Sequence, residues 1–225
     1  MNKLKNRLMA ARAAWSFIDL VRHPEHLDRV FEMADAMSAQ KRDVLEAMRA
    51  HFAMDPRGAL ALREKHRLVV DLGELQKLPE GTLGRTYADH MIASGLDPAA
   101  LPALPGSDEV GYMRAHLYET HDVWHAVTGW STDVAGELGL QAFYAAQTPG
   151  GLPLALIAVG FLNAAFFTPS DRERRFQAVV DGWQMGKRAQ PLFGVRWDDL
   201  WGRPIDEVRA LFGVKPYART LSAAA

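Results

Sequence analysis

Two histidines and an aspartate in the middle of the chain have the spacing of a metal-binding motif. His121 and His125 are four residues apart, and Asp122 follows the first of them. On an α-helix each residue turns by about 100°, so the two imidazoles would lie about 40° apart and one turn removed. The Asp122 carboxylate would fall within the same arc. Two imidazoles at this spacing are an arrangement that binds a transition metal from one face of a helix.

A fourth candidate ligand, Glu137, comes eleven residues after the second histidine. Gly129 is typical of a helix end, and a new helix is expected to begin near Thr132 or Asp133, with Glu137 in its first turn. A reversal of the chain could return this carboxylate to the histidines, and Gly136 would let the two backbones approach closely. The sequence therefore predicts a metal site on a pair of helices, with the ligands His121, Asp122, His125 and Glu137.

The ligand types narrow the choice of metal without deciding it. The chain has no cysteine, so thiolate sites and disulfides are excluded. Imidazole nitrogens with carboxylate oxygens suit Zn²⁺, which we expect most, and also Fe²⁺ or Mn²⁺. If all four groups bind the ion, the site could be closed and structural. If Asp122 instead hydrogen-bonds to one of the ligands without contacting the metal, a coordination position opens for water or substrate.

Composition places the chain among ordinary globular proteins. It has 225 residues, 48% of them hydrophobic, and 26 basic against 27 acidic residues give a formal charge of −1. A nucleic-acid-binding protein usually carries a strong basic excess, so we expect no nucleic acid partner. The first 14 residues contain four basic residues and no acid. We interpret them as part of a surface helix, with a mitochondrial presequence or a membrane-touching helix as alternatives.

Helix signals dominate the chain, and strand signals are scarce. We therefore predict an all-α fold, one domain over residues 1–225, built as an irregular helical bundle with a metal-binding helix pair and an apolar ligand groove. The expected helices are a basic N-terminal helix over about 3–34, then 40–52, 55–68, 85–93, one long helix over 107–128, one from 132 or 133, one over 170–189, and two short pieces within 197–212.

The segment after Glu137 is unusually apolar, because no charged residue occurs before Asp171. Residues 152–167 are nearly all apolar, but sixteen residues fall short of the ~20 that span a bilayer. They predict a buried core helix that could also line a lipid pocket or help to dock on a membrane. The helix that follows carries basic residues, which we interpret as a solvated face or a surface for anionic lipid. They are Arg172, Arg174, Arg175, Lys187 and Arg188.

The motif His121-Asp122-x-x-His125-x11-Glu137 resembles the metal motif of the ubiquinone (coenzyme Q) biosynthesis protein Coq-four family. Further similar segments are Leu78-Pro-Glu-Gly-Thr-Leu-Gly84, the residues from Glu119 to Gly129, and Gly136-Glu-Leu-Gly139. The resemblance covers roughly residues 78–213.

This resemblance implies an α-helical protein of ubiquinone biosynthesis that binds a divalent metal, usually zinc, through the four residues of the motif. It implies oxidative decarboxylation of a polyprenylated hydroxybenzoate, a role as organiser of the biosynthetic complex, or both. The implied partners are a polyprenylated quinone precursor, other ubiquinone-biosynthesis proteins and a membrane surface, and a homodimer is compatible. The implied location is the bacterial cytoplasm, peripheral on the inner membrane, or the matrix side of the membrane in mitochondria.

Two alternatives stay open at this point. The protein could be a prenyl-lipid carrier or scaffold in which the metal only joins two helices. It could also be a phosphohydrolase of the His-Asp-domain type, in which His90 or His116 and Asp171 or Asp181 complete the metal site. That second alternative leaves Glu137 without a role.

Overall fold

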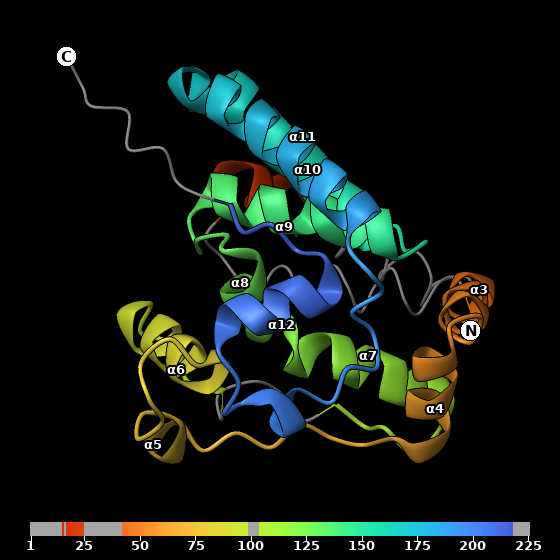
Figure 1. The fold of residues 1–225 in the computed structure, drawn as a ribbon. Coiled ribbons are helices and arrows are strands. Elements are labelled where there is room, and N and C mark those ends of the chain that lie inside the picture. Colours follow the sequence, from red (N-terminus) through yellow and green to blue (C-terminus); the bar gives the residue numbers. More distant parts are fainter. Residues whose placement is uncertain (1–14, 16, 25–41, 99–103, 218–225) are drawn as a thin grey trace. The chain divides into compact units, whose positions relative to one another are not determined.

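The protein is described from a computed structural model, in which residues 15, 17–24, 42–98 and 104–217 are placed (Figure 1). Within these residues the regular structure is helical, and the extended pairing consists of one isolated antiparallel bridge between Thr82 and Pro204. The prediction of an all-α fold is therefore confirmed for this part of the chain. Most of the predicted N-terminal helix over 3–34 lies outside the described residues. Within its described part, residues 17–22 are helical.

The helices run along the chain as follows: α3 Arg42–Phe52, α4 Pro56–Glu64, α5 Leu72–Leu75, α6 Leu83–Ala93, α7 Glu109–Glu119, α8 His121–Thr128, α9 Val134–Gln147, α10 Leu152–Phe166, η2 Pro169–Asp171, α11 Arg172–Arg188, η3 Trp197–Leu200 and α12 Ile205–Phe212. They fall into two units. Unit 1 takes residues from 1–56 and 133–187, and unit 2 from 57–132 and 188–225. The chain enters each unit twice, so no single cut along the sequence separates them.

Unit 2 is organised around α8, against which α6 and α12 pack (Figure 1). Trp124 and Val123 of α8 are fully buried, as are Tyr87 and Met91 of α6. The start of α6 is tied to the segment before α12 by backbone hydrogen bonds. In two of them, Leu83 donates to the carbonyl of Arg203 and Gly84 to that of Trp201. Burial of large apolar side chains is the main stabilising contribution to such a core.

Unit 1 is built on close contacts between α9, α10 and α11. A side chain at Gly182 of α11 would place its Cβ 2.0 Å from the carbonyl oxygen of Gly139 in α9. A Cβ at Gly160 of α10 would lie 2.5 Å from the side chain of Leu138. At Gly182 only glycine permits the two backbones to approach this closely, whereas the neighbour of Gly160 is a side chain. On another side of α10, Leu20 of the helix over 17–22 packs against Val159.

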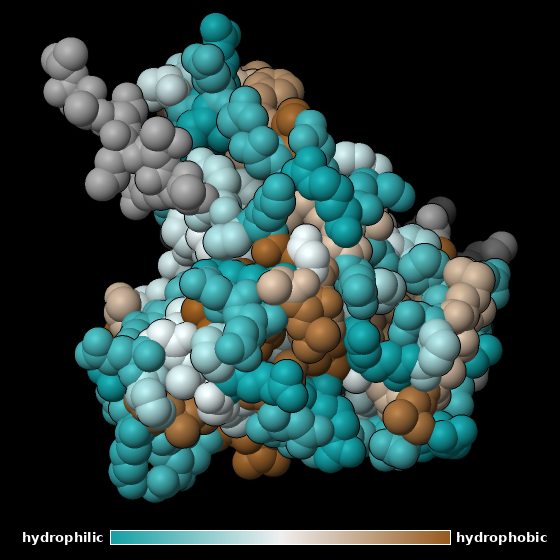
Figure 2. Space-filling model, viewed as in Figure 1, coloured by the Kyte–Doolittle hydropathy of each residue, from teal (hydrophilic) through white to brown (hydrophobic). Residues whose placement is uncertain are grey.

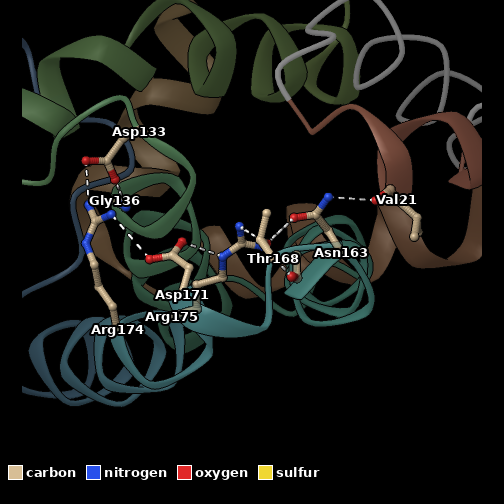
Figure 3. Close-up of polar contacts among 9 residues, drawn as sticks. Val21, Asp133, Gly136, Asn163, Thr168, Asp171, Arg174 and Arg175 are labelled. Atoms are coloured by element: carbon tan, nitrogen blue, oxygen red, sulfur yellow. Dashed lines mark hydrogen bonds and ion pairs between the residues drawn. The ribbon is translucent and has the colours of Figure 1, made fainter. Parts of the chain in front are cut away.

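Arg175 is a core residue of unit 1, which corrects the prediction that it belongs to a solvated basic face. The side chain is 3% exposed and donates to Asp171 Oδ2 at 2.8 Å, to the Gly160 carbonyl at 2.7 Å and to Asn163 Oδ1 at 2.8 Å (Figure 3). It also donates to Thr168 Oγ1 at 2.9 Å. The turn between α10 and α11 folds these oxygens around the guanidinium, which the fork of five N–H groups can satisfy.

Two predicted helix bounds are wrong for local reasons. The helix expected over 55–68 ends at Glu64, because Lys65 adopts a left-handed conformation with φ 54°. The helix expected from Ser170 begins at Arg172. Ser170 lies inside the 3₁₀ turn η2, and Thr168 precedes that turn with its hydroxyl bonded to Asn163 Oδ1.

The apolar segment 152–167 forms α10 and is only partly a core helix. Pro153, Val159 and Ala164 are buried, whereas Leu154 and Phe166 are 59% and 73% exposed. None of the helices in the described part of the chain combines the length and apolar character that a bilayer crossing requires.

Candidate metal centre

The three clustered residues of the motif come together on α8. The ligand atoms that His121, Asp122 and His125 offer all lie within 4.8 Å of one another. Ligands of a tetrahedral ion at about 2.1 Å are separated by roughly 3.4 Å, so small side-chain rotations would suffice for all three to contact one ion. The two imidazole rings stand nearly perpendicular, at 87°, with centroids 4.8 Å apart. A donor set of two nitrogens and one carboxylate fits Zn²⁺, Fe²⁺ or Mn²⁺.

The His125 ring is oriented by a backbone carbonyl. His125 is 1% exposed, and its Nδ1 lies 3.0 Å from the carbonyl oxygen of Trp130. Because a carbonyl only accepts, Nδ1 must carry the proton and Nε2 keeps its lone pair. Metal-binding histidines are typically held by such a contact, which sets the tautomer and the ring direction. Gly129 permits it, since the left-handed conformation at φ 77° turns the chain back at the end of α8.

The helix is interrupted just before the motif, although one continuous helix over 107–128 was predicted. The structure ends α7 at Glu119 and begins α8 at His121. Thr120 lies between them with φ −99° and ψ 0°, and its hydroxyl donates to the His116 carbonyl at 2.7 Å. The Thr120 amide donates to the same carbonyl at 3.0 Å, so the hydroxyl shares this acceptor with the backbone hydrogen bond. Because α8 begins at His121, Asp122 falls in the first turn of a helix, where the backbone dipole favours a carboxylate.

The far end of α8 is held by residues that sequence reasoning missed. Arg209 of α12 donates to the carbonyls of Val127 at 2.9 Å and Ala126 at 3.1 Å. The Tyr217 amide donates to the Thr128 carbonyl at 2.8 Å. The last carbonyls of a helix have no partner within it, so these contacts satisfy groups that would otherwise need water. No sequence pattern links Arg209 to α8, because 82 residues separate it from Val127.

Helix α6 adds two aromatic side chains beside the motif. The His90 ring stacks on His125, with centroids 5.5 Å apart and an angle of 22° between the rings. Tyr87 is 1% exposed. Burial, and then the Asp122 carboxylate, raise the pKa of the Tyr87 hydroxyl far above its ordinary value. Tyr87 therefore stays protonated and can donate a hydrogen bond at any physiological pH.

Glu137 lies in the first turn of α9, as predicted. Asp133 caps that helix by accepting from the Gly136 amide at 3.0 Å, and Arg174 binds the same Asp133 carboxylate at 2.5 Å (Figure 3). Helix α9 belongs to unit 1 and α8 to unit 2. The structure thus brings together three of the four predicted ligands, and coordination by Glu137 stays a prediction.

Comparison with known proteins identifies the family. The sequence model of "Coenzyme Q (ubiquinone) biosynthesis protein Coq4" matches residues 1–218. The chain belongs to the Coq4 family. It is 31% identical over 175 residues to a mitochondrial COQ4 protein of Yarrowia lipolytica, an alignment that covers 75% of this chain and 65% of that one. It is 28% identical over 218 residues to the rat mitochondrial COQ4 homolog, covering 95% of this chain and 79% of the relative.

A crystal structure confirms the fold. A protein of Nostoc punctiforme PCC 73102, assigned provisionally to ubiquinone biosynthesis, matches with a TM-score of 0.78 and 28% identity. The match covers 92% of this chain and 98% of the other. The resemblance read from the motif and its neighbouring segments is therefore confirmed, and it extends over more of the chain than residues 78–213.

Proposed function

We propose that this Coq4-family chain binds one divalent metal ion through His121, Asp122, His125 and Glu137, and that the site serves oxidative decarboxylation of a polyprenylated hydroxybenzoate in ubiquinone biosynthesis. The observation that carries this proposal is the clustering of three ligand atoms within 4.8 Å on α8. The Trp130 carbonyl supports it, because that contact prepares His125 Nε2 to bind a metal.

The bound ion would supply Lewis-acid stabilisation for the ring carboxylate or phenolate. Replacing a ring carboxylate by a hydroxyl releases carbon dioxide and removes two electrons, so the reaction also needs an oxidant such as dioxygen, and dioxygen or water must supply the hydroxyl oxygen. Iron could take part in this electron transfer, whereas zinc has no redox chemistry. The identity of the metal therefore decides whether the ion itself can accept electrons from the substrate. Among the residues of the chain, Tyr87 is held protonated beside Asp122 and would donate a hydrogen bond to a substrate oxygen.

We also propose that α10 and α11 dock on a membrane surface, where a polyprenylated substrate would reside. These two helices and the C-cap residue of α10, Phe167, expose large apolar side chains to between 46% and 73%, namely Leu154, Phe166, Phe167, Phe176, Val180 and Trp183. Hydrophilic side chains run along the face of α11 in view (Figure 2). Lys187 lies over the Trp183 ring at 5.9 Å. Aromatic residues mixed with cations are favoured at the boundary between lipid and water. An apolar groove for the isoprenoid tail stays a prediction.

The test of the metal proposal is elemental analysis by plasma mass spectrometry on protein purified without a metal-affinity step. Wild type is compared with a His121→Ala/His125→Ala variant, and His51→Ala, an exposed histidine of α3, is the control. We expect about one metal per chain in wild type and in the control. The double variant should lose both the metal and the release of carbon dioxide from a polyprenylated hydroxybenzoate.

Wild-type protein that holds no metal after incubation with zinc, iron and manganese would overturn the proposal. Loss of thermal stability with unchanged carbon dioxide release would instead support the alternative of a scaffold or lipid carrier with a structural metal. Binding to anionic vesicles tests the membrane surface. It should fall in a Phe176→Ser/Trp183→Ser variant and persist after Val69→Ser, which changes an exposed valine of unit 2.

A further inference from the structure

Unit 2 contains a small pocket that the proposed metal chemistry does not use. It lies between α4, α7 and the segment 194–196, and its polar lining consists of Arg57, Glu64, His66, Tyr112, His116 and Arg196. The pocket holds about 20 Å³. A single buried water needs about 10–15 Å³, so only a ligand of a few atoms fits.

Two buried side chains fix the direction of a hydrogen-bond donor in this pocket. The Gly194 amide donates to His116 Nε2 at 3.1 Å, so the proton of this imidazole is on Nδ1. His116 Nδ1 lies 3.3 Å from the Tyr112 hydroxyl oxygen and donates to it. The Tyr112 hydroxyl, on a residue 1% exposed, therefore keeps its own proton for another acceptor. The described side chains around it supply none.

His116 and Tyr112 are both neutral at physiological pH, so the directions of their hydrogen bonds do not change in this range. Burial lowers the pKa of His116 to about 4. Burial, followed by the charge of Glu119, raises the pKa of Tyr112 to about 12. The tyrosine thus presents an O–H donor and never a phenolate under these conditions.

Arg196 supplies a positive charge that is only loosely paired. Its guanidinium lies 3.4 Å from His66 Nδ1, 3.5 Å from Asp199 and 3.9 Å from Glu64. Paired guanidinium and carboxylate groups normally approach to about 2.7–2.9 Å. His66 holds its place because its Nε2 donates to Asp198 Oδ2 at 2.7 Å, which leaves Nδ1 to accept from Arg196.

We propose that this pocket binds a small carboxylate of the size of formate, with Tyr112 Oη–H and the Arg196 guanidinium as the two donors. Two arginines, Arg57 and Arg196, line the pocket against one carboxylate, Glu64, so the lining favours an anion, and the volume excludes larger ones. The Glu64 carboxylate in the lining repels a dianion such as phosphate more strongly than a monoanion such as formate. This inference is independent of the metal site and of the reaction proposed there.

The test is saturation-transfer NMR on the full chain with formate at constant ionic strength, with inorganic phosphate as a second ligand. We expect saturable transfer to formate and none that saturates to phosphate. Tyr112→Phe keeps the ring and removes one hydrogen bond, so it should weaken formate binding about 5- to 20-fold. Arg196→Gln removes a charge-assisted donor and should weaken it about 10- to 100-fold.

Two matched variants serve as controls. Tyr118→Phe changes another tyrosine of α7, and Arg63→Gln changes an exposed arginine of α4, neither of which lines the pocket. Both should bind formate as wild type does, and circular dichroism confirms that each variant is folded. Absence of transfer in wild type, or transfer that survives both Tyr112→Phe and Arg196→Gln, would overturn the proposal and leave the pocket as a site for water.

Discussion

Replacement of Arg175 by methionine should strongly destabilise unit 1. Methionine has a similar length and no charge, so it keeps much of the packing and removes every hydrogen bond of the guanidinium. The carbonyl of Gly160, Asn163 Oδ1 and Thr168 Oγ1 would each lose a donor at 2.7–2.9 Å. Asp171 would lose its partner at 2.8 Å but keep Arg174 at 3.5 Å. Asn163 would still donate to the Val21 carbonyl, so part of the network would survive (Figure 3).

The size of the effect follows from the burial of the partners. One hydrogen bond to a charged group contributes about 1.5–3 kcal/mol, but removal of one member of a buried ionic network typically costs about 3–5 kcal/mol in total. Asp171 is 27% exposed and would regain water, which reduces its share of the loss. We therefore expect the lower end of this range, about 3 kcal/mol in the free energy of unfolding.

The assay is equilibrium unfolding in urea, followed by tryptophan fluorescence and by circular dichroism. Arg172→Met, in an exposed residue of the same helix, is the control and should change stability by less than about 0.5 kcal/mol. Arg175→Lys keeps the charge but cannot bind four oxygens at once, so it should fall between the two. A loss below about 1 kcal/mol for Arg175→Met, or one no larger than the control, would refute the reasoning.

Two further predictions concern single residues. Gly182→Ala should cost about 3 kcal/mol or more, because its Cβ would lie 2.0 Å from a backbone oxygen of α9. Gly202→Ala, whose Cβ meets nothing within 4 Å, should be nearly neutral, and equal thermal midpoints for the two would contradict the close helix contact. His116 has a folded-state pKa of about 4 against 6.5 in the unfolded chain, so the unfolded state binds the proton more readily between these values. The neutral, buried His116 therefore contributes about 3 kcal/mol to the free energy of unfolding above pH 6.5. This contribution is lost as the pH falls to 4. Urea unfolding at pH 7, 5.5 and 4.5 should show a smaller loss for His116→Gln than for wild type, and parallel curves would count against a buried neutral histidine.

The failures of prediction in this chain share one physical origin. Ser107 and Ser170 were expected to begin helices, yet Asp108 caps α7 and the turn η2 takes up Ser170. Thr120 separates α7 from α8 within a stretch of good helical spacing, and both its hydroxyl and its amide bond to the His116 carbonyl. In each case several nearby residues could form a comparable local interaction, and the sequence pattern alone does not rank them.

The sequence by itself determined the class of the fold, the family and the spacing of the predicted metal ligands. Helix periodicity, Gly129 as a helix end and Glu137 in a first turn are local properties, and local properties can be read from neighbouring residues. Only the tertiary structure decided that Arg175 is buried, that Arg209 holds the end of α8, and that Trp130 orients His125. A long charged side chain can be solvated at the surface or bonded to buried oxygens. Which of the two occurs depends on which carbonyls the fold leaves without partners.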